Sequence, residues 1–253
     1  MSVSKWREEL KRKTLNTFLL EHDINERDDD AHGMTPLMVA ADCSNGLCSD
    51  HTVKRLLDKG ADVNLRDKRG MTALMLASLC SETKAQMLID KGADVNRQNK
   101  DGWTALMYAA NYSAENTVQM LLDKDADVNR QDKDGWTALM AAVQTSTGIT
   151  NTVQMLIDKG ADVNLRGKTG MTALMIAASW SNETMSQMLL DKGADVNLQD
   201  EDGWTALIYA TGITLSENTV RILLDKGADV NLQDKDGEAA YDLAMELNSM
   251  PVA

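Results

Sequence analysis

Cys43, Cys48 and His51 are the residues of this chain whose types and spacing come nearest to a metal site. Thiolate sulfur and imidazole nitrogen are ligands that zinc prefers. The spacing C-x₄-C-x₂-H, however, lies at the loose edge of the spacings that zinc sites use. We therefore predict no metal site and no cofactor, and we expect reduced, half-buried thiols.

The residue types and spacings of this sequence indicate no catalytic site. The histidines are His22, His32 and His51, and the sequence has neither a glycine-rich phosphate loop nor a nucleophile elbow. The carboxylates recur at regular positions, as in Asp-Lys-Gly-Ala-Asp, which indicates a structural role. We therefore predict that the chain is not an enzyme.

A repeated motif supplies the elements that would position any binding residue. The segment Gly-Trp-Thr or Gly-Met-Thr, most often followed by Ala-Leu, returns along the chain, and its glycine stands at Gly33, Gly70, Gly102, Gly135, Gly170, Gly203 and, with a divergent continuation, Gly237. A second motif, Gly-Ala-Asp-Val-Asn, ends at Asn64, Asn96, Asn129, Asn164, Asn197 and Asn231. Each asparagine precedes the next glycine by six residues, so all variation in repeat length falls inside the copies.

The residue pattern of each copy predicts two short helices. Thr104 stands where the first helix should begin, and a threonine there can cap the free backbone N–H groups. Val118 and Leu121 recur at helical spacing on the second helix. A glycine in the left-handed conformation then ends that helix. Asp125 replaces this glycine once, and because aspartate tolerates a positive φ we expect a modest local cost.

This pattern resembles the ankyrin repeat, whose period is about 33 residues and whose signature is Thr-Pro-Leu-His-x-Ala. The resemblance covers nearly the whole chain and implies an all-α solenoid of stacked antiparallel helix pairs with projecting β-turn finger loops. We predict one domain over residues 1–253. It would consist of an N-terminal half unit (1–29, with a lone second helix over 4–25), six full repeats (30–236) and a partial C-terminal unit (237–253).

Cys80 occupies the same repeat position as Cys43. We expect the two residues to lie about one helix-packing distance apart, roughly 10 Å, which is too far for a disulfide. The repeated asparagines should hydrogen-bond backbone across the finger turn. In proteins similar to this one such asparagines can also be hydroxylated.

The resemblance further implies a protein-interaction module that binds a partner protein or peptide along its concave groove and finger loops. The residue between the glycine and the threonine is Met or Trp in most copies, and both types are common in binding surfaces. The alternative is a hydrophobic staple, in which this residue packs on the fourth residue of the helix. The staple would pair Trp103 with Tyr108, Trp204 with Tyr209 and Met71 with Leu76.

Trp136 is the clearer case for binding, because its staple partner would be Ala141, which is too small to cover an indole. At the end of the first helix the residues differ in every copy, and Tyr112 and Trp180 bring large apolar faces to that position. The predicted partner-binding residues are Met71, Trp103, Tyr112, Trp136, Met171, Trp180 and Trp204.

Two other functions stay open. Tryptophan pockets could hold methylated lysine or basic peptides through cation–π contacts, and the formal net charge of −13 would favour such ligands. The chain could also be a structural spacer or a regulatory subunit with no independent partner.

The composition narrows the classes of partner and compartment. With 26 Lys and Arg against 39 Asp and Glu, the chain does not resemble nucleic-acid-binding proteins, which neutralise phosphates with clustered cations. We find no export signal and no membrane span. Three cysteines cannot form a disulfide framework, so we expect a monomer in the cytoplasm, a reducing compartment.

Overall fold

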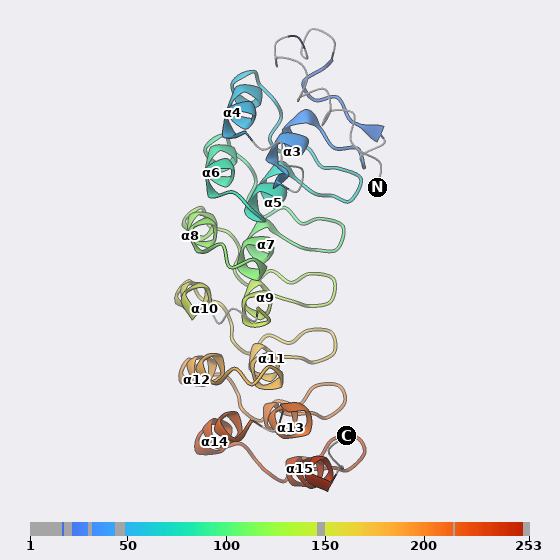
Figure 1. Cartoon of the computed structure of the whole chain (residues 1–253), viewed down its shortest axis with the longest axis vertical. Coiled ribbons are helices and arrows are strands. Elements are labelled where there is room, and N and C mark those ends of the chain that lie inside the picture. The colour runs from blue at the N-terminus through green and yellow to red at the C-terminus, as the bar shows by residue number, and fades with distance from the viewer. Residues whose placement is uncertain are drawn as a thin grey trace. The chain divides into compact units, whose positions relative to one another are not determined.

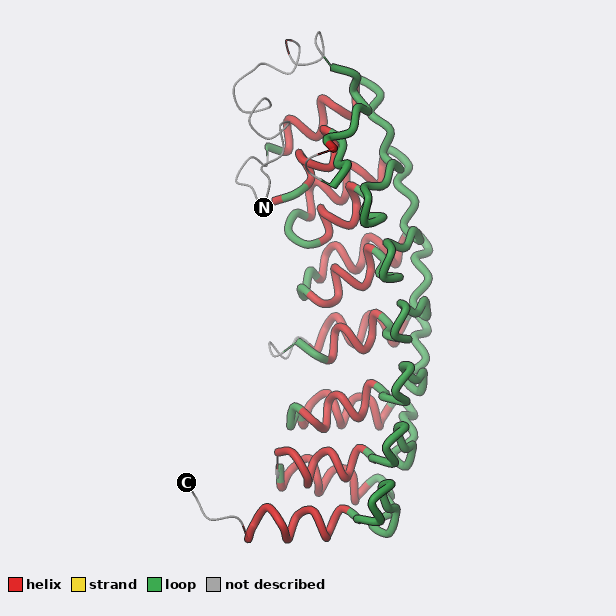
Figure 2. The backbone as a smooth tube through the Cα atoms, turned by 90° about the vertical axis from the view of Figure 1, so that its right-hand side faces the viewer, coloured by secondary structure: helices red, strands yellow, loops and turns green. Residues whose placement is uncertain are grey.

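The computed structural model describes residues 17, 22–29, 32–43, 49–145, 150–214 and 216–249. In this part of the chain the regular elements are helices, and strand-like pairing is limited to two isolated bridges, Asp28 with Met34 and Gln233 with Ala239. Figure 2 shows the helices and the loops that connect them. The predicted all-α class is therefore confirmed. The helix predicted over residues 4–25 lies almost entirely outside the described residues.

Backbone contacts divide the chain into two compact units, Met1–Asp127 and Val128–Ala253. The described residues of the first unit form three helix pairs: α3 (Pro36–Ala41) with α4 (Asp50–Asp58), α5 (Ala73–Ser78) with α6 (Glu82–Asp90), and α7 (Ala105–Asn111) with α8 (Glu115–Asp123). Each helix packs on its partner and on the equivalent helix of the next pair. Within this unit the first helices α3, α5 and α7 lie beside the projecting loops, and the second helices lie on the side away from the loops (Figure 1).

The second unit has the same organisation. Its elements are α9 (Ala138–Val143), α10 (Thr150–Asp158), α11 (Ala173–Ser179), α12 (Glu183–Asp191), α13 (Ala206–Tyr209), the π-helical turn η3 (Ala210–Thr214), α14 (Glu217–Asp225) and α15 (Ala240–Ser249). Here α9, α11, α13 and α15 are first helices, and α10, α12 and α14 are second helices. Repetition of one helix pair thus accounts for both units.

Threonine caps and small apolar residues explain why each pair forms where it does. Thr104 accepts a hydrogen bond from the backbone N–H of Met107 at 3.2 Å, as predicted, and the other first helices from α3 to α13 begin in the same way. Ala109 and Val118 are completely buried between helices. Because alanine is small, it permits the helices to pack closely.

Most loops are closed by a side chain at their base, whereas the loop that leads to Met171 has Gly167 at that position. One carboxylate oxygen of Asp200 accepts hydrogen bonds from the backbone N–H groups of Asp202 (3.0 Å) and Trp204 (2.8 Å). Asp67, Asn99, Asp132 and Asp234 bind their loops in the same way. The regular carboxylates therefore include a set with the structural role that the sequence indicates, and these carboxylates fix the backbone at Met71, Trp136 and Trp204.

Neighbouring loops are also joined to one another through the backbone. In the first unit Lys100 N–H donates to the carbonyl of Arg69 at 2.8 Å, and in the second Glu201 N–H donates to Thr169 at 2.8 Å. The loops therefore approach so closely that no side chain fits between them at some positions. A Cβ atom at Gly170, for example, would lie 2.7 Å from the Cα atom of Asp200.

The repeated asparagines join each pair to the next one. Asn164 Nδ2 donates to the carbonyl of Gly193 at 3.1 Å, and its Oδ1 accepts from the backbone N–H of Asp195 at 2.8 Å. Asn64, Asn96, Asn129 and Asn197 make the equivalent two bonds. The prediction of a side chain-to-backbone bond is confirmed, but its partner lies in the following repeat instead of in the asparagine's own finger.

Asn164→Ala should therefore lower the free energy of unfolding by about 1–2 kcal/mol, since two hydrogen bonds are lost. Asn231→Ala is the matched control, because the Asn231 amide donates at 3.0 Å to Asp229 in its own turn and should contribute little. Urea denaturation followed by circular dichroism measures both variants. Equal losses of stability would contradict the assignment of the effect to the bonds between repeats.

Asp125 ends α8 with a φ of 58°, so the predicted left-handed conformation is confirmed. Gly60 and Gly160, at the same repeat position, have φ values of 87° and 89°. Asp125→Gly should raise the free energy of unfolding by about 0.5–1 kcal/mol, because glycine adopts this conformation without steric cost. Lys124→Gly, one residue earlier at a φ of −106°, should lower it by about 1 kcal/mol. Thermal or urea unfolding of both variants checks the opposite signs.

Candidate functional site

The first unit has a cavity of about 560 Å³ between its loops and its first helices. Its apolar lining comes from Met71, Leu76, Leu79, Tyr108 and Tyr112, and its polar lining from Asp42, Lys68, Arg69, Asn99, Lys100 and Asp101. The structure thus brings two predicted binding residues, Met71 and Tyr112, to one cavity.

Met71 forms a buried part of this lining, since only 6% of its surface is exposed. The Tyr108 hydroxyl donates to the Met71 sulfur at 3.4 Å and accepts from Asn99 Nδ2 at 2.9 Å. Burial raises the pKa of the Tyr108 hydroxyl, and the nearby charge of Asp101 adds to the effect. The hydroxyl therefore remains a neutral donor that holds Met71 in place.

Two of the predicted staples are confirmed. The ring centroids of Trp103 and Tyr108 lie 5.0 Å apart, as do those of Trp204 and Tyr209. The Tyr209 hydroxyl also donates to the carboxylate of Asp200 at 2.7 Å, and burial and this carboxylate together raise the pKa of Tyr209. Trp103 and Trp204 are half-buried, so each packs on its own helix and keeps part of its surface exposed.

Trp136 differs from these two tryptophans. Ala141 occupies the place of the staple tyrosine and is itself buried, and within the described residues no aromatic ring stacks on Trp136. The indole is half-buried, and its backbone N–H is held by Asp132 at 2.8 Å. Trp136 is thus fixed at its backbone but lacks the aromatic cover of the other two.

Tyr112 and Trp180 are the most exposed of the predicted binding residues, with 60% and 59% of their surfaces accessible. They occupy the same position in different units, directly after α7 and α11. Met171, also in the second unit, is half-buried at the base of its loop. The structure thus places exposed aromatic side chains where the sequence predicts contact residues.

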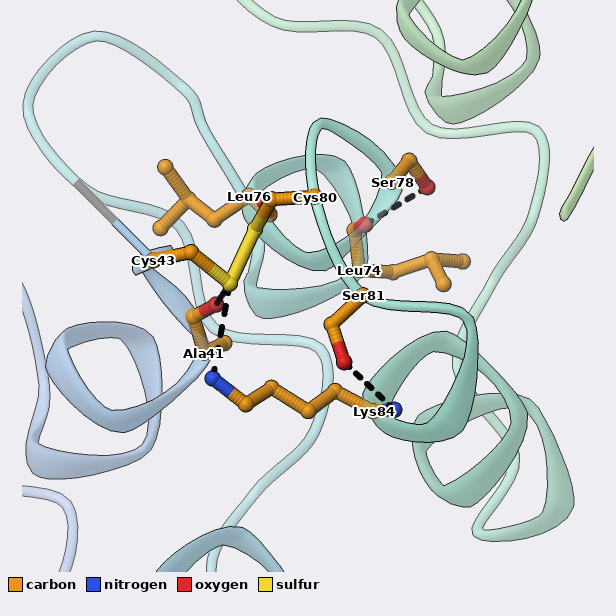
Figure 3. Close-up of a disulfide and its surroundings, with 8 residues drawn as sticks. All are labelled: Ala41, Cys43, Leu74, Leu76, Ser78, Cys80, Ser81 and Lys84. Carbon is orange, nitrogen blue, oxygen red and sulfur yellow. Dashed lines mark hydrogen bonds between the residues drawn. A yellow bond between two sulfur atoms is a disulfide. The ribbon is translucent and has the colours of Figure 1, made fainter. Parts of the chain in front are cut away.

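The expectation for the cysteines is wrong: Cys43 and Cys80 form a disulfide, with their Cα atoms 6.1 Å apart (Figure 3). The predicted 10 Å applies to the axes of packed helices, whereas both cysteines lie just beyond helix ends. Asp42 has an extended backbone with a ψ of 113°, while Leu79 at the equivalent position is helical. The extended backbone of Asp42 directly after α3 thus accompanies the approach of Cys43 to Cys80.

This disulfide overturns the expectation of reduced thiols and removes the argument for a reducing compartment. The sulfur of Cys43 is shared with Cys80, Cys48 lies outside the described residues, and among the described residues no group of three His, Cys, Asp or Glu could hold a metal ion. The half-buried reduced thiols expected for Cys43 and Cys80 are not what the structure contains. The number of cysteines therefore no longer supports a reducing compartment.

Comparisons with known proteins agree with the repeated fold. A family model described as ankyrin repeats in three copies matches residues 43–132, 82–167, 115–200, 148–234 and 188–252. The chain is 53% identical over 45 residues to ankyrin repeat domain-containing protein 63 of Mus musculus and of Homo sapiens. This similarity covers 18% of the chain and 12% of each relative.

In the described part of the chain, no helix has the length and apolar character needed to cross a bilayer.

Proposed function

Because the chain belongs to the ankyrin repeat family, whose repeats are generally protein-interaction modules, we propose that it binds a partner protein or peptide. The partner would contact the loops and the ends of the first helices. The cavity of about 560 Å³ that Met71 and Tyr112 line is the observation that carries this proposal. An apolar side chain of the partner would enter it, and the charged residues around it would contact the partner's backbone and polar groups.

Pre-organisation is the physical basis of the proposed binding. Met71 is held by the Tyr108 hydroxyl, and the backbone of Met71 is held by the Asp67 carboxylate at 2.8 Å. Little conformational entropy would therefore be lost when a partner docks, which favours affinity. Tyr112 would supply a large and rigid contact surface at its edge.

In the second unit, Trp180 and Trp136 are the proposed main contacts. Trp180 is largely exposed, and tryptophan is among the residue types that contribute most to binding energy. Met171 and Trp204 would contribute smaller contacts from the bases of their loops.

We further propose a cytoplasmic, monomeric, non-enzymatic protein that binds neither nucleic acid nor membrane.

Affinity capture with the full chain tests this function. Wild type, Tyr112→Ala and Tyr241→Ala would be compared as baits in a lysate of the source organism, and the captured partner would then be titrated by calorimetry. Tyr241 is the matched control, because it is 68% exposed and is not among the residues that line the cavity of the first unit. Loss of binding in Tyr112→Ala alone supports the proposal. Equal binding by all three baits contradicts the role of the cavity.

The methylated-lysine alternative has weaker support, because the rings of Trp103 and Trp204 each pack on a tyrosine, which covers part of the indole that would have to contact the methylated ammonium. Titration of tryptophan fluorescence with methylated and unmethylated basic peptides distinguishes the two functions. A response confined to the methylated peptides would favour the reader. A structural spacer or regulatory subunit would capture no partner in the first experiment.

A further inference from the structure

Lys84 is a buried lysine that the repeat does not require. It lies in α6 with 1% of its surface exposed, and the equivalent buried residues of the other second helices are Thr117, Thr152, Met185 and Thr219. Burial of an ammonium group is costly unless the group finds a polar partner. The side chain therefore needs a specific explanation.

The sulfur of Cys43 provides that explanation. Lys84 Nζ donates to Cys43 Sγ at 3.5 Å, and Figure 3 shows the ammonium pointing at the sulfur of the disulfide. Cys43 is half-buried and Cys80 is exposed. When the disulfide is reduced, the ammonium lies beside the Cys43 thiol, and a cation at that place favours the thiolate over the thiol. Because thiolates are the nucleophilic form of cysteine, Cys43 becomes the more reactive of the pair.

We propose that Cys43, Lys84 and Cys80 form a site that reacts with hydrogen peroxide. The Cys43 thiolate attacks one oxygen of the peroxide: an S–O bond forms, the O–O bond breaks, and hydroxide leaves. The Cys80 sulfur then attacks the resulting sulfenic acid, so that the S–S bond forms and the S–O bond breaks. The departing hydroxide takes up the proton of the Cys80 thiol, and the hydroxide of the first step takes up the proton that the Cys43 thiol released on ionising. Overall, two thiols lose two electrons to one peroxide, which yields the disulfide and two waters.

The position of the pair connects it to the surface of the first unit. Asp42 and Leu79, which directly precede the two cysteines, line the cavity that contains Met71 and Tyr112. Cys80 and Tyr112 together line a neighbouring cavity of about 480 Å³. A small oxidant therefore has access to the pair from the side on which Cys80 is exposed. This inference does not depend on the identity of a partner.

The test follows oxidation of the fully reduced, full-length chain by hydrogen peroxide, with alkylation at set times and peptide mass spectrometry. We expect a Cys43–Cys80 disulfide as the product. Its rate of formation should fall at least tenfold in Lys84→Met and less than twofold in Lys54→Met. Methionine suits the buried place, because Met185 occupies it in α12. Lys54 is an exposed lysine of α4, so the control removes the same charge.

Two single-cysteine-exchange variants identify the reacting sulfur without any change at Lys84. In Cys80→Ser, dimedone should label Cys43 as the sulfenic acid, whereas in Cys43→Ser, Cys80 should react at least tenfold more slowly.

The pH profile of Cys43 alkylation should move to higher pH when Lys84→Met is added to Cys80→Ser. A wild-type rate in Lys84→Met, faster labelling of Cys80, or a disulfide that contains Cys48 would each overturn the proposal.

Discussion

Gly170→Ala is expected to lower the free energy of unfolding by about 3 kcal/mol or more, whereas Gly160→Ala should lower it by only about 1 kcal/mol. Both glycines have a left-handed backbone, with φ values of 82° and 89°. Both variants are therefore destabilised by the steric strain of a Cβ atom in that conformation. A Cβ atom at Gly170 would also lie 2.7 Å from the Cα atom of Asp200, but at Gly160 it meets nothing within 4 Å. The next loop must therefore move only in Gly170→Ala.

Urea denaturation of both variants and wild type, followed by circular dichroism, measures this difference. The pair is informative because backbone conformation and substitution are the same and only the approach of the neighbouring loop differs. If both variants lose about 1 kcal/mol, the loops are not packed against each other as tightly as the structure has them.

The double variant Trp136→Ala, Trp180→Ala is expected to weaken partner binding at least 100-fold, or about 3 kcal/mol. Trp136 lacks the aromatic cover that Tyr108 and Tyr209 give to the equivalent tryptophans, and Trp180 is largely exposed. Both therefore have surface to bury in a complex. Calorimetry with the captured partner measures the affinity, and circular dichroism establishes that the variant is folded.

Trp204→Ala provides the contrast for this experiment. Trp204 packs on Tyr209, so its replacement should lower stability more than affinity. Unchanged affinity in a folded double variant would reject Trp136 and Trp180 as the main contacts. Loss of binding in Trp204→Ala alone would transfer that role to the base of the loop.

Much of the fold could be predicted because each repeat uses local interactions that the sequence displays directly. The cap at Thr104, the left-handed Asp125 and the pairing of Trp103 with Tyr108 each depend on residues a few positions apart. Such contacts follow from helix geometry once the repeat is identified. The same reasoning predicted that Trp136 would lack a partner for its ring.

The features that could not be predicted depend on contacts between repeats. The direction of the Asn164 amide is decided by where Gly193 lies in the next pair, which the spacing of residues within one copy does not determine. The disulfide depends on the extended backbone of Asp42, a departure from the equivalent residues of other copies. The role of Lys84 does not follow from the sequence for a similar reason, because its partner Cys43 lies 41 residues away.

The asparagine contacts described above bear on how a protein of this kind changes during evolution. Asn64 and Asn164 bind only the main-chain atoms of the following pair, and every amino acid carries those atoms. A duplicated or deleted helix pair would therefore meet the same main-chain hydrogen-bonding partners on either side, whatever side chains it carried at its exposed positions. Such a chain can gain or lose whole repeats, and the exposed residues of its repeats can change, while the asparagine hydrogen bonds between repeats are kept.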